Sequence, residues 1–135
     1  MARHYHIDIA VFAADSDRKW VDNLLSHFDV PGVDSAKQGV ARRVSAHGIY
    51  HVALVRVLSR DGGMSVDVAL AFAQRLLTTD ANHAELSPWL ELRIDRHEFQ
   101  REIDARIADA VESIVPRRRG RPPSKDSMQQ QKGRP

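Results

Sequence analysis

The sequence predicts a small, mainly α-helical protein, and three observations lead to this fold class. Apolar residues recur at helical spacing in several separate segments, whereas alternating, strand-like patterns are short. Hydrophobic residues make up 42% of the chain and aromatic residues only 6%, so we expect a mostly aliphatic core. A length of 135 residues fits one compact domain with appendages.

The absence of Cys limits the chemistry that this chain can perform. Disulfides, thiolate metal sites and cysteine nucleophiles are excluded, which suits a reducing compartment. The N-terminus, MARHYHIDIA, has no signal-peptide pattern, and no apolar run approaches membrane-spanning length. We expect a cytoplasmic, nucleoid-associated protein with no membrane partner.

Two helices are predicted near the N-terminus. Residues 7–14, IDIAVFAA, are nearly all apolar and fit a buried strand or a short helix, and their neighbours favour the helix. Asp15 and Ser16 offer cap chemistry for a second helix that extends to Phe28. Its apolar residues are Trp20, Val21, Leu24, Leu25 and Phe28. Its other face is polar and partly cationic and consists of Arg18, Lys19, Asp22, Asn23 and Ser26.

A basic hairpin and two further helices follow. Pro31 and Gly32 end the second helix, and residues 32–45 combine glycines with short β-prone pieces, which predicts a hairpin-like loop. Ser45 is a predicted N-cap for the next helix, which ends at the Asp-Gly-Gly step of residues 61–63. Ser65 is the predicted cap of another helix that extends to residue 77.

The C-terminal part is predicted as a linker, a strand and a long helix. Residues 78–88 are polar and turn-rich, whereas residues 89–95 alternate apolar and charged side chains as a strand does. A helix over 96–115 carries an apolar stripe that needs a partner surface, either the same chain or another copy. We assign the stripe to a homodimer. Its members are Phe99, Ile103, Ile107, Val111 and Ile114. The sequence therefore predicts three regions, namely a mainly helical domain over 1–79, a dimerisation region over 80–115 and a disordered basic tail over 116–135.

The order of pieces in residues 7–77 is typical of a winged helix-turn-helix. Such a domain inserts its second helix into the major groove and offers cations on a wing to flanking phosphates. The stretches GVARRVS (39–45) and HVALVRVLSRDGGMSVDVALAFAQRLL (51–77) resemble the DNA-binding domain of the MerR family, in which a hairpin leads into a serine-capped helix and then a glycine break. An ordinary small helical domain with solvated polar faces fits the same stretch.

This interpretation assigns DNA-binding side chains to two elements. The recognition helix contributes Ser16, Arg18, Lys19 and Asn23. The wing contributes Lys37, Arg42 and Arg43.

The C-terminal segment, from residue 116 onward, concentrates positive charge. It holds seven basic side chains against one acidic, a net charge of +6 that leaves −4 for the rest of the chain. Its low apolar content predicts disorder in the free protein. Its Arg-Gly-Arg-Pro core at 119–122 is similar to the AT-hook, in which glycine lets the backbone approach a narrow A·T-rich minor groove between two arginines. The hook residues are Arg117, Arg118, Arg119, Gly120, Arg121, Pro122 and Lys125. A generic basic tail is the alternative interpretation.

Catalytic and metal-binding patterns are not found in the sequence. His47 and His51 stand four residues apart, but no Cys or nearby acidic residue completes a metal site. No phosphate loop, nucleophile elbow or dinucleotide fingerprint appears, so we expect no cofactor and no enzyme. The sequence predicts a transcriptional regulator that binds double-stranded, A·T-rich DNA. An architectural DNA-binding protein, or a protein-binding adaptor anchored to DNA by its tail, are the alternatives.

Overall fold

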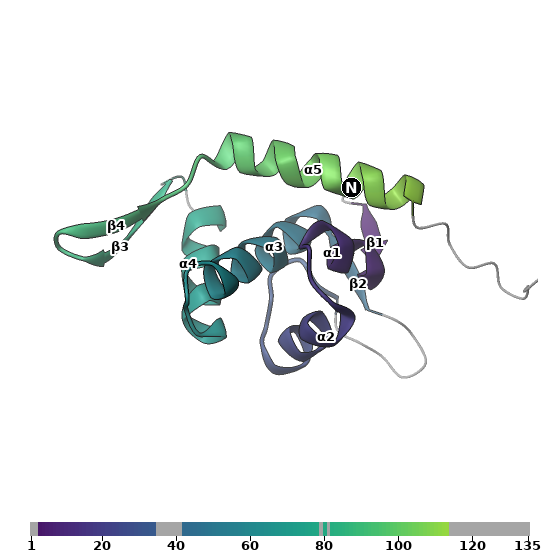
Figure 1. Ribbon diagram of the computed structural model, residues 1–135, viewed down its shortest axis with the longest axis horizontal. Coiled ribbons are helices and arrows are strands. Elements are labelled where there is room, and N and C mark those ends of the chain that lie inside the picture. Colours follow the sequence, from purple (N-terminus) through teal and green to yellow (C-terminus); the bar gives the residue numbers. More distant parts are fainter. Residues whose placement is uncertain (1–2, 35–41, 79, 81, 114–135) are drawn as a thin grey trace, which may run out of the picture.

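The computed structural model describes residues 3–34, 42–78, 80 and 82–113, and these are mainly helical (Figure 1). No helix within these ranges is long and apolar enough to cross a membrane. The elements in chain order are β1 (His4–His6), α1 (Ile7–Ala13), α2 (Arg18–His27), β2 (Arg43–Ser45), α3 (Ala46–Arg60), α4 (Val66–Thr78), β3 (His83–Ser87), β4 (Leu90–Arg93) and α5 (Arg96–Ser113).

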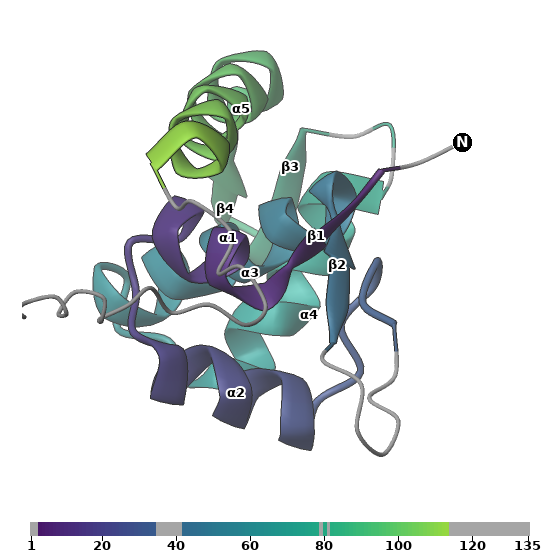
Figure 2. The ribbon, with the colours of Figure 1, turned by 90° about the vertical axis from the view of Figure 1, so that its right-hand side faces the viewer.

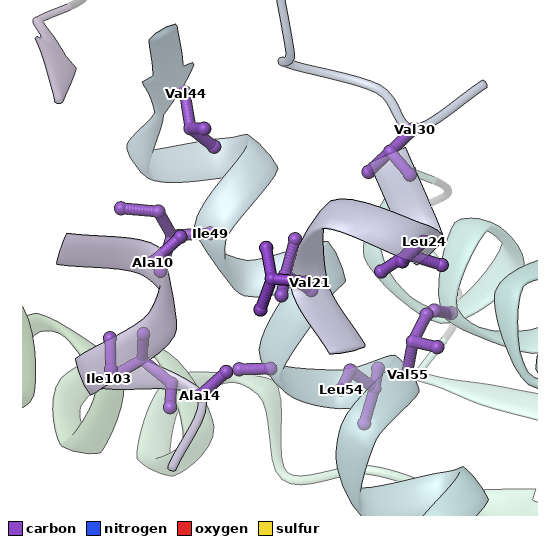
Figure 3. Close-up of a cluster of buried hydrophobic side chains, with 14 of the residues drawn as sticks. Ala10, Ala14, Val21, Leu24, Val30, Val44, Ile49, Leu54, Val55 and Ile103 are labelled. Carbon is purple, nitrogen blue, oxygen red and sulfur yellow. The ribbon is translucent and has the colours of Figure 1, made fainter. Parts of the chain in front are cut away.

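Helix α3 lies at the centre of the core (Figure 3). It packs against α4, α1, β2 and α5, and Ile49, Val52 and Val55 are fully buried. Burying one such side chain stabilises the fold by about 1.5–3 kcal/mol. The apolar face that the sequence predicts for this helix is confirmed except at Val57, which is 40% exposed, and the predicted end of the helix at Asp61 is confirmed.

The two N-terminal helices form as predicted, but the residue that caps the N-terminus of α2 is not one of the predicted residues. Residues 7–13 are helical, and Asp17 caps α2 by accepting the Trp20 backbone N–H at 2.8 Å. The prediction of Asp15 and Ser16 as capping residues is wrong. Asp17 caps the helix because it stands three positions before Trp20, where a side-chain oxygen reaches that amide. Asp15 and Ser16 precede this cap and form the turn between the helices.

The two described ends of the predicted hairpin pair with each other. Val33 bridges to Val44, and the Asp34 N–H donates to the Arg43 carbonyl at 2.9 Å. The tip of the hairpin, with Lys37, lies outside the described residues. Strand β2 also pairs antiparallel with β1, and the three residues of β1 carry no alternating pattern that would predict a strand.

The close packing of Gly32 on Gly48 positions this hairpin against the start of α3. The Ser45 hydroxyl accepts the Gly48 N–H at 3.1 Å, which confirms the predicted N-cap. The Ser45 N–H donates in turn to the Gly32 carbonyl at 2.9 Å. A Cβ on Gly32 would stand 2.5 Å from the Gly48 nitrogen, so only glycine permits this approach.

The predicted linker over 78–88 is wrong in its second half. Residues 83–87 form β3, which pairs antiparallel with β4 through Ala84 opposite Leu92 and Glu85 opposite Glu91. The sequence does not predict this strand, because its charged and polar residues are typical of a loop. Its single buried side chain, Ala84, packs into the core beside α4.

The apolar stripe of α5 packs on its own chain. Ile103 is 3% exposed and Ile107 5%, and α5 lies along α1 and α3. Arg106 Nη1 donates to the Ala13 carbonyl at 3.1 Å, and the Phe99 ring packs edge-to-face on Tyr50. Phe99 and Val111 are partly buried against the same core, and Ile114 lies outside the described residues.

Ile103 and Ile107 are therefore covered by their own chain and are not available to another copy, so the dimerisation assignment of these two residues is wrong. Residues on both sides of the proposed boundary at 79–80 belong to one hydrophobic core, which includes Leu77, Ala84 and Ile103.

Acid is expected to destabilise the fold through His51. Its side chain is fully buried, its Nδ1 lies 2.9 Å from the His47 carbonyl, and burial lowers the pKa of His51 below its usual value. Near and below the unfolded pKa of His51, the unfolded chain therefore binds more proton at this side chain than the folded chain does, so stability falls as the pH drops. Urea unfolding at about pH 7.5 and about pH 5.5 should show a smaller pH effect in His51→Met than in the parent. The exposed His97→Met should keep the parent's pH effect, and an unchanged effect in His51→Met contradicts the prediction.

Candidate nucleic-acid interface

A tight turn over residues 14–17 fixes α2 relative to α1. Asp15 adopts φ = 53°, a left-handed conformation that Asp tolerates better than most residues. Its N–H donates to the Phe12 carbonyl at 3.1 Å, and the Ser16 N–H donates to the Val11 carbonyl at 3.1 Å. Arg60, at the end of α3, donates to the Asp15 carbonyl at 3.2 Å. Hydrogen bonds from α1 and from the end of α3 therefore hold the turn that leads into α2.

Helix α2 presents a polar face to solvent. Val21, Leu24 and Leu25 are buried against the core, so Lys19 and Asn23 lie on the exposed side, one helical turn apart. Figures 1 and 2 both show α2 at the edge of the molecule, on the side opposite α5. This exposed face is the first half of the candidate interface.

Arg18 does not extend freely from this face. Its Nη1 lies 2.8 Å from Asp8 Oδ1, and its Nε lies 3.3 Å from Asp22 Oδ2. The guanidinium therefore bridges α1 and α2, and two carboxylates offset its charge. Asp8 was not anticipated as its partner, because it stands ten residues earlier and meets Arg18 only through the turn.

Ser16 also occupies a different place from the one predicted. It precedes α2, and its Oγ is buried without a hydrogen-bond partner among the described residues. It is therefore part of the turn and does not lie on the exposed face of α2.

The base of the hairpin lies beside α2 and forms the second half of the candidate interface. Arg42 Nη2 donates to the Ser26 hydroxyl at 3.4 Å, which connects the two elements. Arg43 is exposed at the start of β2, and Figure 2 shows this end of β2 on the same side of the molecule as α2. The Arg56 guanidinium stacks 4.9 Å from the Trp20 ring and holds α2 on α3.

The charge of this surface is mixed. Lys19, Arg42 and Arg43 contribute cations, while α2 and its flanks also carry carboxylates. These carboxylates are Asp17, Asp22, Asp29 and Asp34. A phosphate backbone approaching α2 would meet both signs, so strong nonspecific attraction has to come from elsewhere in the chain.

The remaining predicted site residues, Lys37 and the whole hook, lie outside the described residues. Within the described ranges, no group of three or more His, Cys, Asp or Glu side chains is arranged to hold a metal ion. Comparison with protein-family models, with curated proteins and with solved structures found no match to this chain.

Proposed function

We propose that this protein is a DNA-binding transcriptional regulator of the winged helix-turn-helix type. The observation that carries the proposal is the joining of two elements: the exposed face of α2 and the arginines at the hairpin base, linked by Arg42 and Ser26. A hydrogen-bonded turn positions α2 relative to α1, and a helix that reads base edges has to be held in a defined orientation. The likeness of residues 39–77 to the MerR family supports the same function.

In this proposal α2 enters the major groove. A helix with side chains is about 10–12 Å across, and the major groove is about 12 Å wide. Asn23 can accept from and donate to one adenine edge at the same time, and Lys19 can contact guanine or phosphate. Arg42 and Arg43 would contact phosphates beside the groove. Arg18 contributes less than the sequence predicts, because Asp8 and Asp22 already pair with it.

The basic tail supplies the attraction that the mixed surface of α2 lacks. Its hook would bind an adjacent A·T-rich minor groove, where arginines are favoured by the narrow groove's negative potential. Two weak modules on one chain bind more tightly than either alone, because the second binding event is intramolecular.

Competition binding on the full chain tests this proposal. Fluorescence anisotropy with A·T-rich, G·C-rich and random duplexes, at several salt concentrations, should show a preference for A·T-rich sites. Equal affinity for all three would favour an architectural protein. A chain of residues 1–115 that loses all DNA binding would favour an adaptor that the tail anchors to DNA.

Lys19→Ala should weaken binding to every duplex and lower the salt dependence of log K by about one unit, because one phosphate contact is lost. The same anisotropy titration measures it. Arg101→Ala is the matched control: it removes one positive charge from an exposed, Glu98-paired position on α5, on the side opposite α2. Equal effects of the two substitutions would overturn the assignment of α2 to the interface.

A further inference from the structure

The β3–β4 hairpin extends away from the body of the molecule and exposes apolar side chains (Figure 1). Trp89 is 82% exposed, Leu90 48% and Leu86 42%. Helix α4 packs against β3, whereas β4 pairs only with β3 among the described residues. A two-stranded hairpin is marginally stable alone, and an open strand edge can pair with another strand. The outer edge of β4 is therefore available for pairing.

One face of the hairpin carries an unbalanced group of charges. Glu85 and Glu91 stand directly opposite each other, an arrangement that destabilises a strand pair. Arg93 Nη2 donates to Glu91 Oε2 at 2.7 Å, and Arg93 Nη1 donates to Asn82 Oδ1 at 3.4 Å, so Arg93 pairs with one of the two carboxylates. A second cation beside Glu91 would stabilise the hairpin.

We propose that the outer edge of β4 pairs antiparallel with β4 of a second copy, with Leu92 on the two-fold axis. This register places Glu91 of each copy opposite Arg93 of the other copy, so each Glu91 gains a second cation beside it. It also places Leu90 opposite Ile94 of the second copy, which continues the apolar face across the junction. A two-fold axis follows directly from antiparallel pairing of identical strands.

The charges of β4 select this register. An axis at Glu91 sets two glutamates opposite each other, and an axis at Arg93 sets two arginines opposite each other. An axis between two neighbouring residues of β4 would place a leucine opposite a charged residue. Opposite residues in a strand pair point to the same face, whereas neighbouring residues of β4 point to opposite faces, so this register is excluded. Only the Leu92 axis matches both the charged and the apolar faces.

The proposed pairing also accounts for Trp89. In this register the residue opposite Trp89 is Asp95 of the second copy, at the base of the other hairpin. The exposed indole would therefore lie against the second copy and lose contact with water. Because the strand has only four residues, the interface is small and the dimer is weak.

Disulfide trapping tests the register, since the parent chain has no Cys. In oxidised Leu92→Cys the two thiols stand opposite each other on the axis, within the distance that a disulfide spans. We expect a covalent dimer on a non-reducing gel. Glu85→Cys, on the strand away from the axis, should stay monomeric at the same concentration. A monomeric Leu92→Cys chain, or equal cross-linking of both variants, would overturn the proposal.

Charge exchange supplies a second test that does not depend on a new Cys. Glu91→Arg removes the repulsion with Glu85 and should leave the hairpin folded, yet it sets the introduced guanidinium against Arg93 of the second copy and should abolish the dimer in sedimentation. The double variant Glu91→Arg with Arg93→Glu restores opposite charges and should restore the dimer. Dimer formation by the single variant, or failure of the double variant to recover it, contradicts the proposal. Neither test involves DNA, so the outcome is separate from that of the proposed function.

Discussion

Gly32→Ala is expected to lower the free energy of unfolding by about 2–5 kcal/mol. Gly32 adopts φ = 84°, where an L-residue costs about 1–2 kcal/mol. The added Cβ would also stand 2.5 Å from the Gly48 nitrogen and 2.6 Å from the Ser45 hydroxyl, and overpacking of this kind costs about 1–3 kcal/mol. Urea denaturation followed by circular dichroism measures the loss, which is a large fraction of the stability of a typical domain.

Gly63→Ala is the matched control for this prediction. Gly63 adopts φ = 70°, but a Cβ there meets nothing within 4 Å. Only the backbone cost applies, so the loss should be about 1–2 kcal/mol. Similar losses in the two variants would show that the contact between Gly32 and Gly48 does not hold the hairpin against α3.

Replacing Arg119 and Arg121 together with Ala is expected to weaken binding to A·T-rich DNA at least about 30-fold. Each arginine inserted in the minor groove contributes about 1–3 kcal/mol, and about 1.4 kcal/mol corresponds to a factor of ten. Anisotropy titration of the full chain at moderate salt measures the change. Unchanged affinity would mean that the Arg-Gly-Arg-Pro core makes no contribution to binding.

A charge-preserving variant separates a hook from a generic basic tail. Arg119→Lys with Arg121→Lys keeps the positive charge, and lysine lacks the planar guanidinium that arginine presents. We expect this variant to retain affinity for random duplexes and to lose the preference for A·T-rich ones. A retained preference would support simple electrostatic attraction.

The sequence was informative wherever one element determines its own structure. Helical spacing located α2, α3, α4 and α5, because an apolar face repeats every three or four residues whatever the element packs against, whereas α1 is too short for its spacing to distinguish helix from strand. The Ser45 cap and the end of α3 at Asp61 were also local, since a capping side chain reaches only the next turn. The exposed face of α2 followed from the same periodicity, so Lys19 and Asn23 were placed correctly on it.

Only the tertiary structure decided which surfaces these elements share. The sequence predicts that Arg18 contacts DNA, yet in the folded chain it forms an ion pair with Asp8, ten residues away in the sequence. The α5 stripe was compatible with the same chain or a second copy, and α1 with α3 supplies the surface. Strand β3 lacks a local signal and forms because β4 pairs with it. The physical reason is common to all three: periodicity shows that a side chain needs a partner, whereas the path of the backbone determines which partner it meets.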